Sequence, residues 1–124
     1  MPAKILIVED DKNLNLMLKL ILKNKSLDWD LQSAHSGQEA LDSLEKFLPD
    51  LIILDIMMPE MDGLEFLSRL RVNKKYASIK LAALSALNDA QTISRAQANG
   101  VDEYWTKPIM PDTLVSNIKR VLGL

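Results

Sequence analysis

Acidic residues follow two of the most apolar segments of the chain. Residues 9–11 are all acidic and come directly after the apolar residues 5–8, and Asp55 comes directly after the apolar residues 51–54. Ionised carboxylates that lie close together repel one another unless a cation sits among them. Mg²⁺, which uses one or two carboxylates and keeps several waters, fits this supply of oxygen ligands. If the two segments are neighbours in the fold, these residues predict a magnesium site.

A hydroxyl and an ammonium group occupy comparable positions further along the chain. Ser85 follows the mostly apolar residues 79–84, and Lys107 comes just after residues 101–105. A divalent cation, an ammonium group, a hydroxyl and a carboxylate together suit a phosphoryl group, for which positioning and charge neutralisation are the main work of catalysis.

Five apolar segments of strand length alternate with five segments of helical periodicity, which predicts an α/β fold. Strands are expected at residues 5–8, 29–34, 51–54, 79–84 and 101–105. Helices are expected around residues 14–21, 40–48, 64–70, 88–99 and 114–122. Residues 5–8 and 51–54 are continuously apolar, as is typical of central parallel strands, whereas residues 29–34 alternate like an edge strand.

The helix termini carry recognisable signals. Asp11 is expected to cap the first helix, Ser36 and Glu39 form a capping box for the second, and Gly100 ends the fourth. The fourth helix has a thin apolar stripe, which predicts weak anchoring. Because crossovers between parallel strands are right-handed, the whole pattern predicts a doubly wound sheet, with its binding site at the carboxyl ends of the strands.

Composition limits the classes of function. The 124 residues amount to a single domain, and their 48% apolar and 26% charged content is that of a soluble globular protein. The net charge of −2 with interspersed signs argues against direct nucleic-acid binding. Without cysteine and with one histidine, thiolate chemistry and multi-histidine metal sites are excluded. The apolar run near Met1 is too short for a signal peptide or membrane insertion, so we expect a cytoplasmic protein.

Five motifs occur in an order that is specific in combination, although each alone is unspecific. They are Glu9-Asp10, Asp55-Ile56-Met57-Met58-Pro59, Asp62-Gly63, Ser85-Ala86 and Thr106-Lys107-Pro108. Over nearly the whole chain, this set resembles the receiver domain of bacterial response regulators, the CheY-like family. The resemblance implies one receiver domain over residues 1–124, with a flavodoxin-like (βα)5 fold and strand order 2-1-3-4-5.

The resemblance also implies roles for the site residues. Asp55 accepts a phosphoryl group from a phosphohistidine, while Asp10, Asp55 and the backbone carbonyl of Met57 ligate Mg²⁺ and Glu9 acts through water. Ser85 bonds a phosphoryl oxygen after modification.

Two residues of the fifth strand and the loop after it have implied roles as well. Lys107 pairs with the phosphate, the Lys107-Pro108 peptide is cis, and Tyr104 fills the space that Ser85 vacates. The switched surface consists of the fourth helix, fifth strand and fifth helix.

The implied partner is a histidine kinase or a histidine phosphotransfer protein. We expect it to contact the exposed part of the first helix at Lys12, Asn13, Asn15 and Lys19. The switched surface is expected to bind a downstream protein or to self-associate. The fifth helix is expected to finish two residues before Leu124, which predicts a stand-alone domain.

Three other functions are disfavoured by particular residues. A Mg²⁺-dependent aspartyl phosphohydrolase generally has a second acid two residues after its nucleophile, where this chain has Met57. A flavodoxin-like nucleotide carrier needs a phosphate-cradling loop, but the loop after the first strand is acidic. A receiver-like scaffold independent of phosphorylation would not require the intact residues Asp10, Asp55, Ser85 and Lys107.

Apolar Met57 and Leu87 also predict slow self-dephosphorylation.

Overall fold

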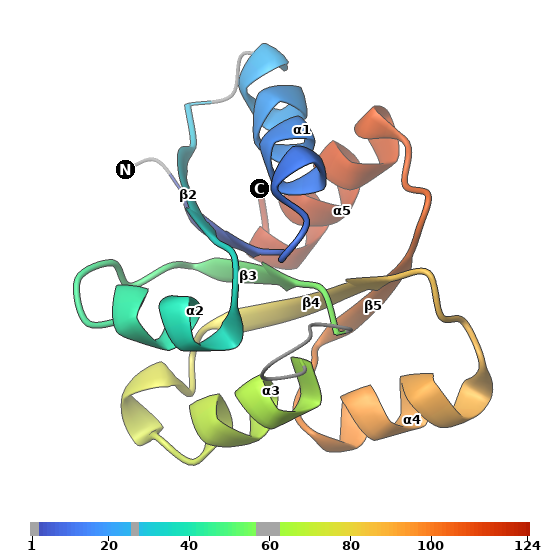
Figure 1. The fold of residues 1–124 in the computed structure, drawn as a ribbon. Coiled ribbons are helices and arrows are strands. Elements are labelled where there is room, and N and C mark those ends of the chain that lie inside the picture. The colour runs from blue at the N-terminus through green and yellow to red at the C-terminus, as the bar shows by residue number, and fades with distance from the viewer. Residues whose placement is uncertain (1–2, 26–27, 57–62) are drawn as a thin grey trace.

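In the part of the chain that the structure describes, five strands form one parallel sheet in the order β2-β1-β3-β4-β5 (Figure 1). The strands are β1 (Lys4–Val8), β2 (Asp30–Ala34), β3 (Leu51–Leu54), β4 (Lys80–Ser85) and β5 (Glu103–Thr106). The structure, a computed structural model, describes residues 3–25, 28–56 and 63–124. The predicted doubly wound sheet and its strand order are confirmed, with the alternating strand β2 at an edge.

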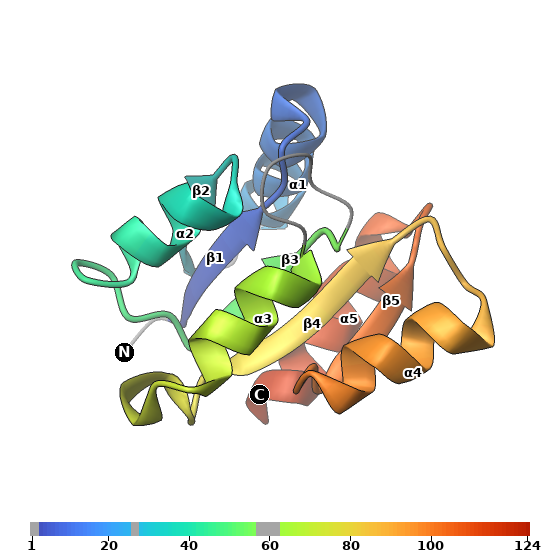
Figure 2. The same cartoon turned by 60° about the horizontal axis from the view of Figure 1, so that its bottom comes forward.

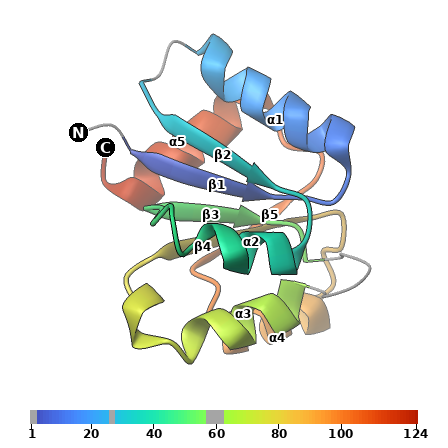
Figure 3. The same ribbon diagram turned by 60° about the vertical axis from the view of Figure 1, so that its left-hand side comes forward.

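Helices cover both faces of the sheet. They are α1 (Lys12–Asn24), α2 (Gly37–Ser43), α3 (Gly63–Arg71), α4 (Ala90–Ala98) and α5 (Pro111–Leu122), with a short 3-10 helix η1 (Lys74–Tyr76). α1 and α5 pack on one face, and α2, α3 and α4 lie on the other (Figure 3). Within the described ranges, no helix is long and apolar enough to pass through a bilayer.

The alternation of side chains along β1 explains why the sheet is covered on both sides. Ile5 and Ile7 join the core beneath α1 and α5, whereas Leu6 and Val8 join the core beneath α2 and α3, where Phe66 is fully buried. These four β1 side chains are 0% exposed, whereas Lys4 at the start of the strand is exposed. A strand with two buried faces must be continuously apolar, as the sequence of residues 5–8 is.

Side-chain caps fix where the helices begin. The Asp11 carboxylate accepts hydrogen bonds from the amides of Asn13 and Leu14, so the predicted cap of α1 is confirmed. At α2, the Ser36 hydroxyl accepts from the Glu39 amide, as predicted, although the Glu39 carboxylate accepts from the amide of His35 rather than that of Ser36. Because Asp11 begins α1 directly after Asp10, this cap determines where the acidic loop ends.

The second helix is shorter than the predicted range 40–48. α2 ends at Ser43, and the next residues form turns in which the Lys46 amide donates to the Ser43 carbonyl. This turn directs Phe47 onto the core and leaves Leu48 49% exposed. The expected helical position of Leu48 was therefore wrong, because Phe47 supplies the apolar contact instead.

The fourth helix is attached mainly at its carboxyl end. Ala96 is its one fully buried residue, in agreement with the weak anchoring expected from its thin stripe. After the helix, Gly100 has a φ of +100°, and its carbonyl accepts hydrogen bonds at 2.9 and 3.2 Å from the guanidinium of Arg71 at the end of α3. The amino end of α4 lies at the β4–α4 loop, on the side of the sheet where the strands end (Figure 2).

Candidate functional site

The carboxyl end of the sheet brings together acidic residues from two strands. Glu9 and Asp10 follow β1, and Asp55 follows β3 directly. Glu9, Asp10 and Asp55 each offer a carboxylate oxygen, and these atoms lie within 4.8 Å of one another. Because β1 and β3 are paired in the sheet, and the Asp55 amide donates to the Val8 carbonyl at 2.9 Å, the cluster is built into the strand register.

Lys107 supplies positive charge to this cluster from the segment after β5. Its ammonium nitrogen lies 2.8 Å from Glu9 Oε1 and 3.6 Å from Asp55 Oδ2. Glu9 and Asp55 are 3% and 8% exposed, and Asp10 lies nearer to solvent. Counting the described residues of the cluster, three carboxylates meet one ammonium group, so negative charge remains for a cation to balance.

The crowding of these groups shifts their pKa values. Burial and the hydrogen bond with Asp55 raise the pKa of Glu9 above its ordinary value, although Lys107 opposes the shift. Burial and the neighbouring Glu9 raise the pKa of Asp10. Burial acts to lower the pKa of Lys107, but its hydrogen bond to Glu9 and the charge of Asp55 raise it overall.

The donor set suits a hard divalent cation. Mg²⁺ prefers carboxylate oxygens and water, and metal binding favours deprotonated ligands, which opposes the raised pKa values of Glu9 and Asp10. The residues present therefore fit the ion expected from the sequence. Met57, whose carbonyl was expected to be a further ligand, lies outside the described residues.

Ser85 is the last residue of β4 and is 1% exposed. Its hydroxyl oxygen accepts a hydrogen bond from the Leu87 amide at 3.1 Å. The Ser85 carbonyl accepts from the Lys107 amide at 2.8 Å, and the Lys107-Pro108 peptide that follows is cis, the isomer implied by the sequence resemblance. Ser85 and Lys107 are thus tied together through their backbones.

Tyr104 contacts the same loop from β5. Its hydroxyl donates to the Leu87 carbonyl, and its ring packs, half-buried, against the core on the α2–α4 side. Trp105 points to the opposite face, where it is 5% exposed and its indole N–H donates to Glu103. Leu87 therefore joins Ser85 and Tyr104: its amide donates to the first, and its carbonyl accepts from the second.

Asn15 lies beside the site, and its role there was not predicted from the sequence. We expected it to be exposed for partner contact, but it is 0% exposed, so that expectation was wrong. Its amide nitrogen donates to the carbonyls of Ile7, Glu9 and Ala34. The available signal was its spacing, because Asn15 precedes the buried Leu18 by three residues on α1.

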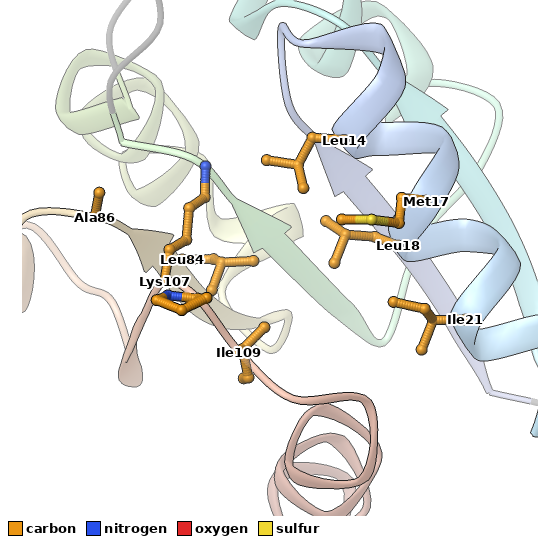
Figure 4. A pocket seen from close by; sticks show the side chains of 9 residues that line it. Leu14, Met17, Leu18, Ile21, Leu84, Ala86, Lys107 and Ile109 are labelled. Carbon is orange, nitrogen blue, oxygen red and sulfur yellow. The ribbon is translucent and has the colours of Figure 1, made fainter.

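An apolar pocket of about 390 Å³ lies between α1 and the ends of β4 and β5 (Figure 4). Its lining consists of Leu14, Met17, Leu18, Ile21, Leu84, Ala86, Lys107, Pro108 and Ile109. Since Lys107 contributes to both, the pocket adjoins the acidic cluster.

Known proteins share this sequence pattern and fold. Residues 5–119 match the sequence model described as the response regulator receiver domain. The transcriptional regulatory protein TrcR of Mycobacterium tuberculosis is 36% identical over 98% of this chain and 46% of its own length. The alkaline phosphatase synthesis transcriptional regulatory protein PhoP of Bacillus subtilis is 34% identical over 98% of this chain and 49% of its own length. The chain spans about half the length of these relatives.

Two solved structures are similar to this chain over all or nearly all of its length. The chemotaxis protein CheY4 of Vibrio cholerae has a TM-score of 0.91 at 30% identity, covering 98% of this chain and 100% of that one. A putative response regulator from Chloroflexus aurantiacus has a TM-score of 0.91 at 31% identity, covering 100% of both chains. Because the family pattern covers residues 5–119 and the acidic cluster and Lys107 stand together at the strand ends, this chain belongs to the response regulator receiver domain family.

Proposed function

We propose that this chain is a phosphoacceptor domain of two-component signalling, in which Asp55 receives a phosphoryl group from a phosphohistidine. One observation carries the proposal: the Asp55 carboxylate stands 3.6 Å from the Lys107 ammonium and within 4.8 Å of the carboxylate oxygens of Glu9 and Asp10. This arrangement offers a nucleophile, a fixed positive charge and a cation site at one strand end. Membership of the receiver family supports the same reading.

The reaction needs little from the protein beyond placement and charge. An Asp55 carboxylate oxygen bonds to phosphorus as the phosphorus–nitrogen bond to the donor imidazole breaks, and the released nitrogen is protonated from solvent. Asp10 and Asp55, with the Met57 carbonyl and with Glu9 through water, would hold Mg²⁺, which neutralises phosphoryl oxygens when bound. Lys107 pairs with the phosphoryl group from the other side. In this role the chain is an acceptor and not a turnover enzyme.

The Ser85–Leu87–Tyr104 contacts suggest how modification reaches the surface. A phosphoryl group adds roughly one to two negative charges and three acceptor oxygens. The Ser85 hydroxyl then leaves the Leu87 amide to donate to a phosphoryl oxygen, and Tyr104 moves toward the vacated space. The resulting population shift alters the α4-β5-α5 surface, which binds a downstream protein or a second copy.

We place the phosphodonor on the face formed by α1 and the pocket. Leu16, Met17 and Leu20 are 55%, 50% and 47% exposed, an unusual amount of apolar surface for one helix. Met17 belongs to both the exposed stripe and the pocket, which Ile109 also lines from the segment after β5 (Figure 4). A helix of a histidine kinase or histidine phosphotransfer protein docked here would bring its histidine near Lys107. With a donor of this kind, we expect the interaction to take place in the cytoplasm.

Acetyl phosphate tests the acceptor role. With Mg²⁺ present, the full chain is expected to gain one phosphoryl group, detected by intact-protein mass spectrometry and located on Asp55 by peptide mapping. Asp55→Asn and removal of Mg²⁺ with a chelator should each abolish the gain. Asp11→Asn is the matched control, because asparagine caps helices as well as aspartate does, and it should be labelled normally.

Each other outcome points elsewhere. Labelling that persists in Asp55→Asn would place the acceptor at another residue. Release of phosphate from free esters would support the phosphohydrolase alternative, and a chain that gains no phosphoryl group would support the scaffold alternative.

A further inference from the structure

Asn15 is buried in the first turns of α1 and lies against the carboxyl ends of two strands. Its side-chain amino group donates to the carbonyl oxygens of Ile7, Glu9 and Ala34 at 3.3, 3.2 and 3.1 Å. The Glu9 amide in turn donates to the Ala34 carbonyl at 3.0 Å. The backbone of Glu9 is thus held on both sides, its N–H by β2 and its carbonyl by α1.

These acceptors determine the orientation of the Asn15 amide. Turning the amide over would place Oδ1 against three carbonyl oxygens, so only the amino group fits there. Oδ1 is buried without a hydrogen-bond partner among the described residues. Burying such an acceptor is unfavourable, and an apolar side chain of similar size would avoid this cost. The contacts of the amino group supply the reason for a polar residue at this position.

The peptide group that Asn15 holds connects two carboxylates of the site. The Glu9 carbonyl belongs to the peptide bond between Glu9 and Asp10, so its position affects both side chains. Asp55 is fixed independently, because its amide donates to the Val8 carbonyl on β1. Functional constellations need their groups held to within about 0.5 Å of the productive geometry. The distance from Asp10 to Asp55 therefore depends on how firmly this peptide is held.

We propose that Asn15 is a positioning residue for the cation site: it fixes the Glu9–Asp10 peptide and thereby sets the affinity of the acidic cluster for Mg²⁺. The inference rests on the proposed function, since it takes this cluster to be the Mg²⁺ site. Asn15 acts through the backbone and touches neither the ion nor the phosphoryl group.

Asn15→Leu tests the proposal, because it keeps a similar volume and removes the donors. The Mg²⁺ dissociation constant of the full chain, measured by calorimetric titration, should rise about tenfold, within the range found for groups that orient metal ligands. Hydrogen exchange at the Glu9 amide of the metal-free protein should also accelerate. Asn15→Ser, which keeps one hydroxyl donor, should give an intermediate Mg²⁺ affinity and serves if the leucine variant does not fold.

Leu22→Ala is the matched control. Leu22 lies on the same helix and is 1% exposed, so its truncation lowers stability through packing without touching Glu9. It should leave both the Mg²⁺ affinity and the Glu9 amide exchange relative to global unfolding unchanged.

Four results separate the possibilities. A folded Asn15→Leu protein with wild-type Mg²⁺ affinity would overturn the positioning role and leave the proposed function standing. Equal weakening by Leu22→Ala would also overturn it, since lost stability would then explain the effect. Selective weakening by Asn15→Leu, in a chain that acetyl phosphate does not label, would support the positioning role and refute phosphoacceptance. A wild-type chain that binds no Mg²⁺ would refute both.

Discussion

Glu9 carries an unfavourable charge in the metal-free site. Burial and Asp55 raise its pKa in the folded protein, so the folded state holds this proton more tightly than the unfolded state does. The free energy of unfolding therefore increases as the pH is lowered through the folded-state pKa of Glu9 toward its unfolded-state pKa. It decreases when the pH is raised. Lys107 offsets part of the cost but does not reverse it.

The difference between wild type and Glu9→Gln should consequently depend on pH. Without Mg²⁺, Glu9→Gln is expected to be the more stable protein at about pH 7.5, and its advantage should shrink as the pH is lowered and Glu9 becomes protonated. Urea unfolding at a series of pH values in the presence of a chelator measures the two free energies. A difference that does not change with pH would contradict the argument. Adding Mg²⁺ should raise the stability of wild type more than that of the variant.

At the scale of elements, the connection between α3 and the end of α4 depends on a glycine. Gly100 has a φ of +100°, and a Cβ added there would lie 2.9 Å from Arg71 Cγ. Arg71 also donates to the carbonyls of Tyr76, Ala77 and Ile79, so this one side chain joins three segments at the end of the sheet opposite the site.

Gly100→Ala should therefore destabilise the fold by about 1–3 kcal/mol, through backbone strain and displacement of Arg71. Gly123→Ala is the natural comparison, because Gly123 also has a positive φ, of +72°, but nothing lies within 4 Å of its added Cβ. It should cost about 1 kcal/mol. Urea unfolding compares the two variants, and equal losses would show that contact with Arg71 contributes nothing.

The strands were predictable from sequence because a parallel strand with two covered faces must be apolar throughout, as residues 5–8 and 51–54 are. The ends of these parallel strands then place Glu9, Asp10 and Asp55 at one edge of the sheet. The end of α2 was not predictable, because Leu48 continues the helical period and only packing decides that Phe47 contacts the core instead. The end of this helix is determined by tertiary contacts, which a local sequence pattern does not show.

Asn15 was missed for a related reason. Asparagine is usually exposed, and its burial here depends on three backbone carbonyls contributed by β1 and β2. Those acceptors come together only when the sheet forms. A local pattern shows that the position faces inward but cannot show what the side chain meets there.

At the scale of the whole molecule, the proposed function gives the two faces of the sheet different roles. The α1 side has the exposed apolar stripe and the pocket beside Lys107, and receives the phosphodonor. The opposite side has α4, with its single buried residue, and transmits the change. The site lies between them at the strand ends, and α5, which belongs to the switched surface, packs on the same face of the sheet as α1.

Met17→Gln should separate protein docking from chemistry. Met17 is 50% exposed, so the change should leave the fold intact while placing a polar amide in the docking surface. Phosphotransfer from a cognate histidine donor is expected to slow about tenfold, as the loss of a buried interface contact costs more than 1 kcal/mol. Labelling by acetyl phosphate, which needs no docking, should proceed at the wild-type rate. Equal slowing with both donors would mean that Met17 affects the site itself, and a wild-type rate with the protein donor would exclude it from the docking surface.

The attachment of α4 at one end has a mechanical consequence. Ala96 and the Gly100–Arg71 contact hold its carboxyl end, while its amino end follows the loop in which Leu87 meets Ser85 and Tyr104. A helix held in this way pivots, and displacement increases with distance from the pivot. The largest change of shape on phosphorylation would then occur in the first turn of α4, beside the loop that senses Ser85. A partner that binds that turn would contact the part of α4 that is displaced most.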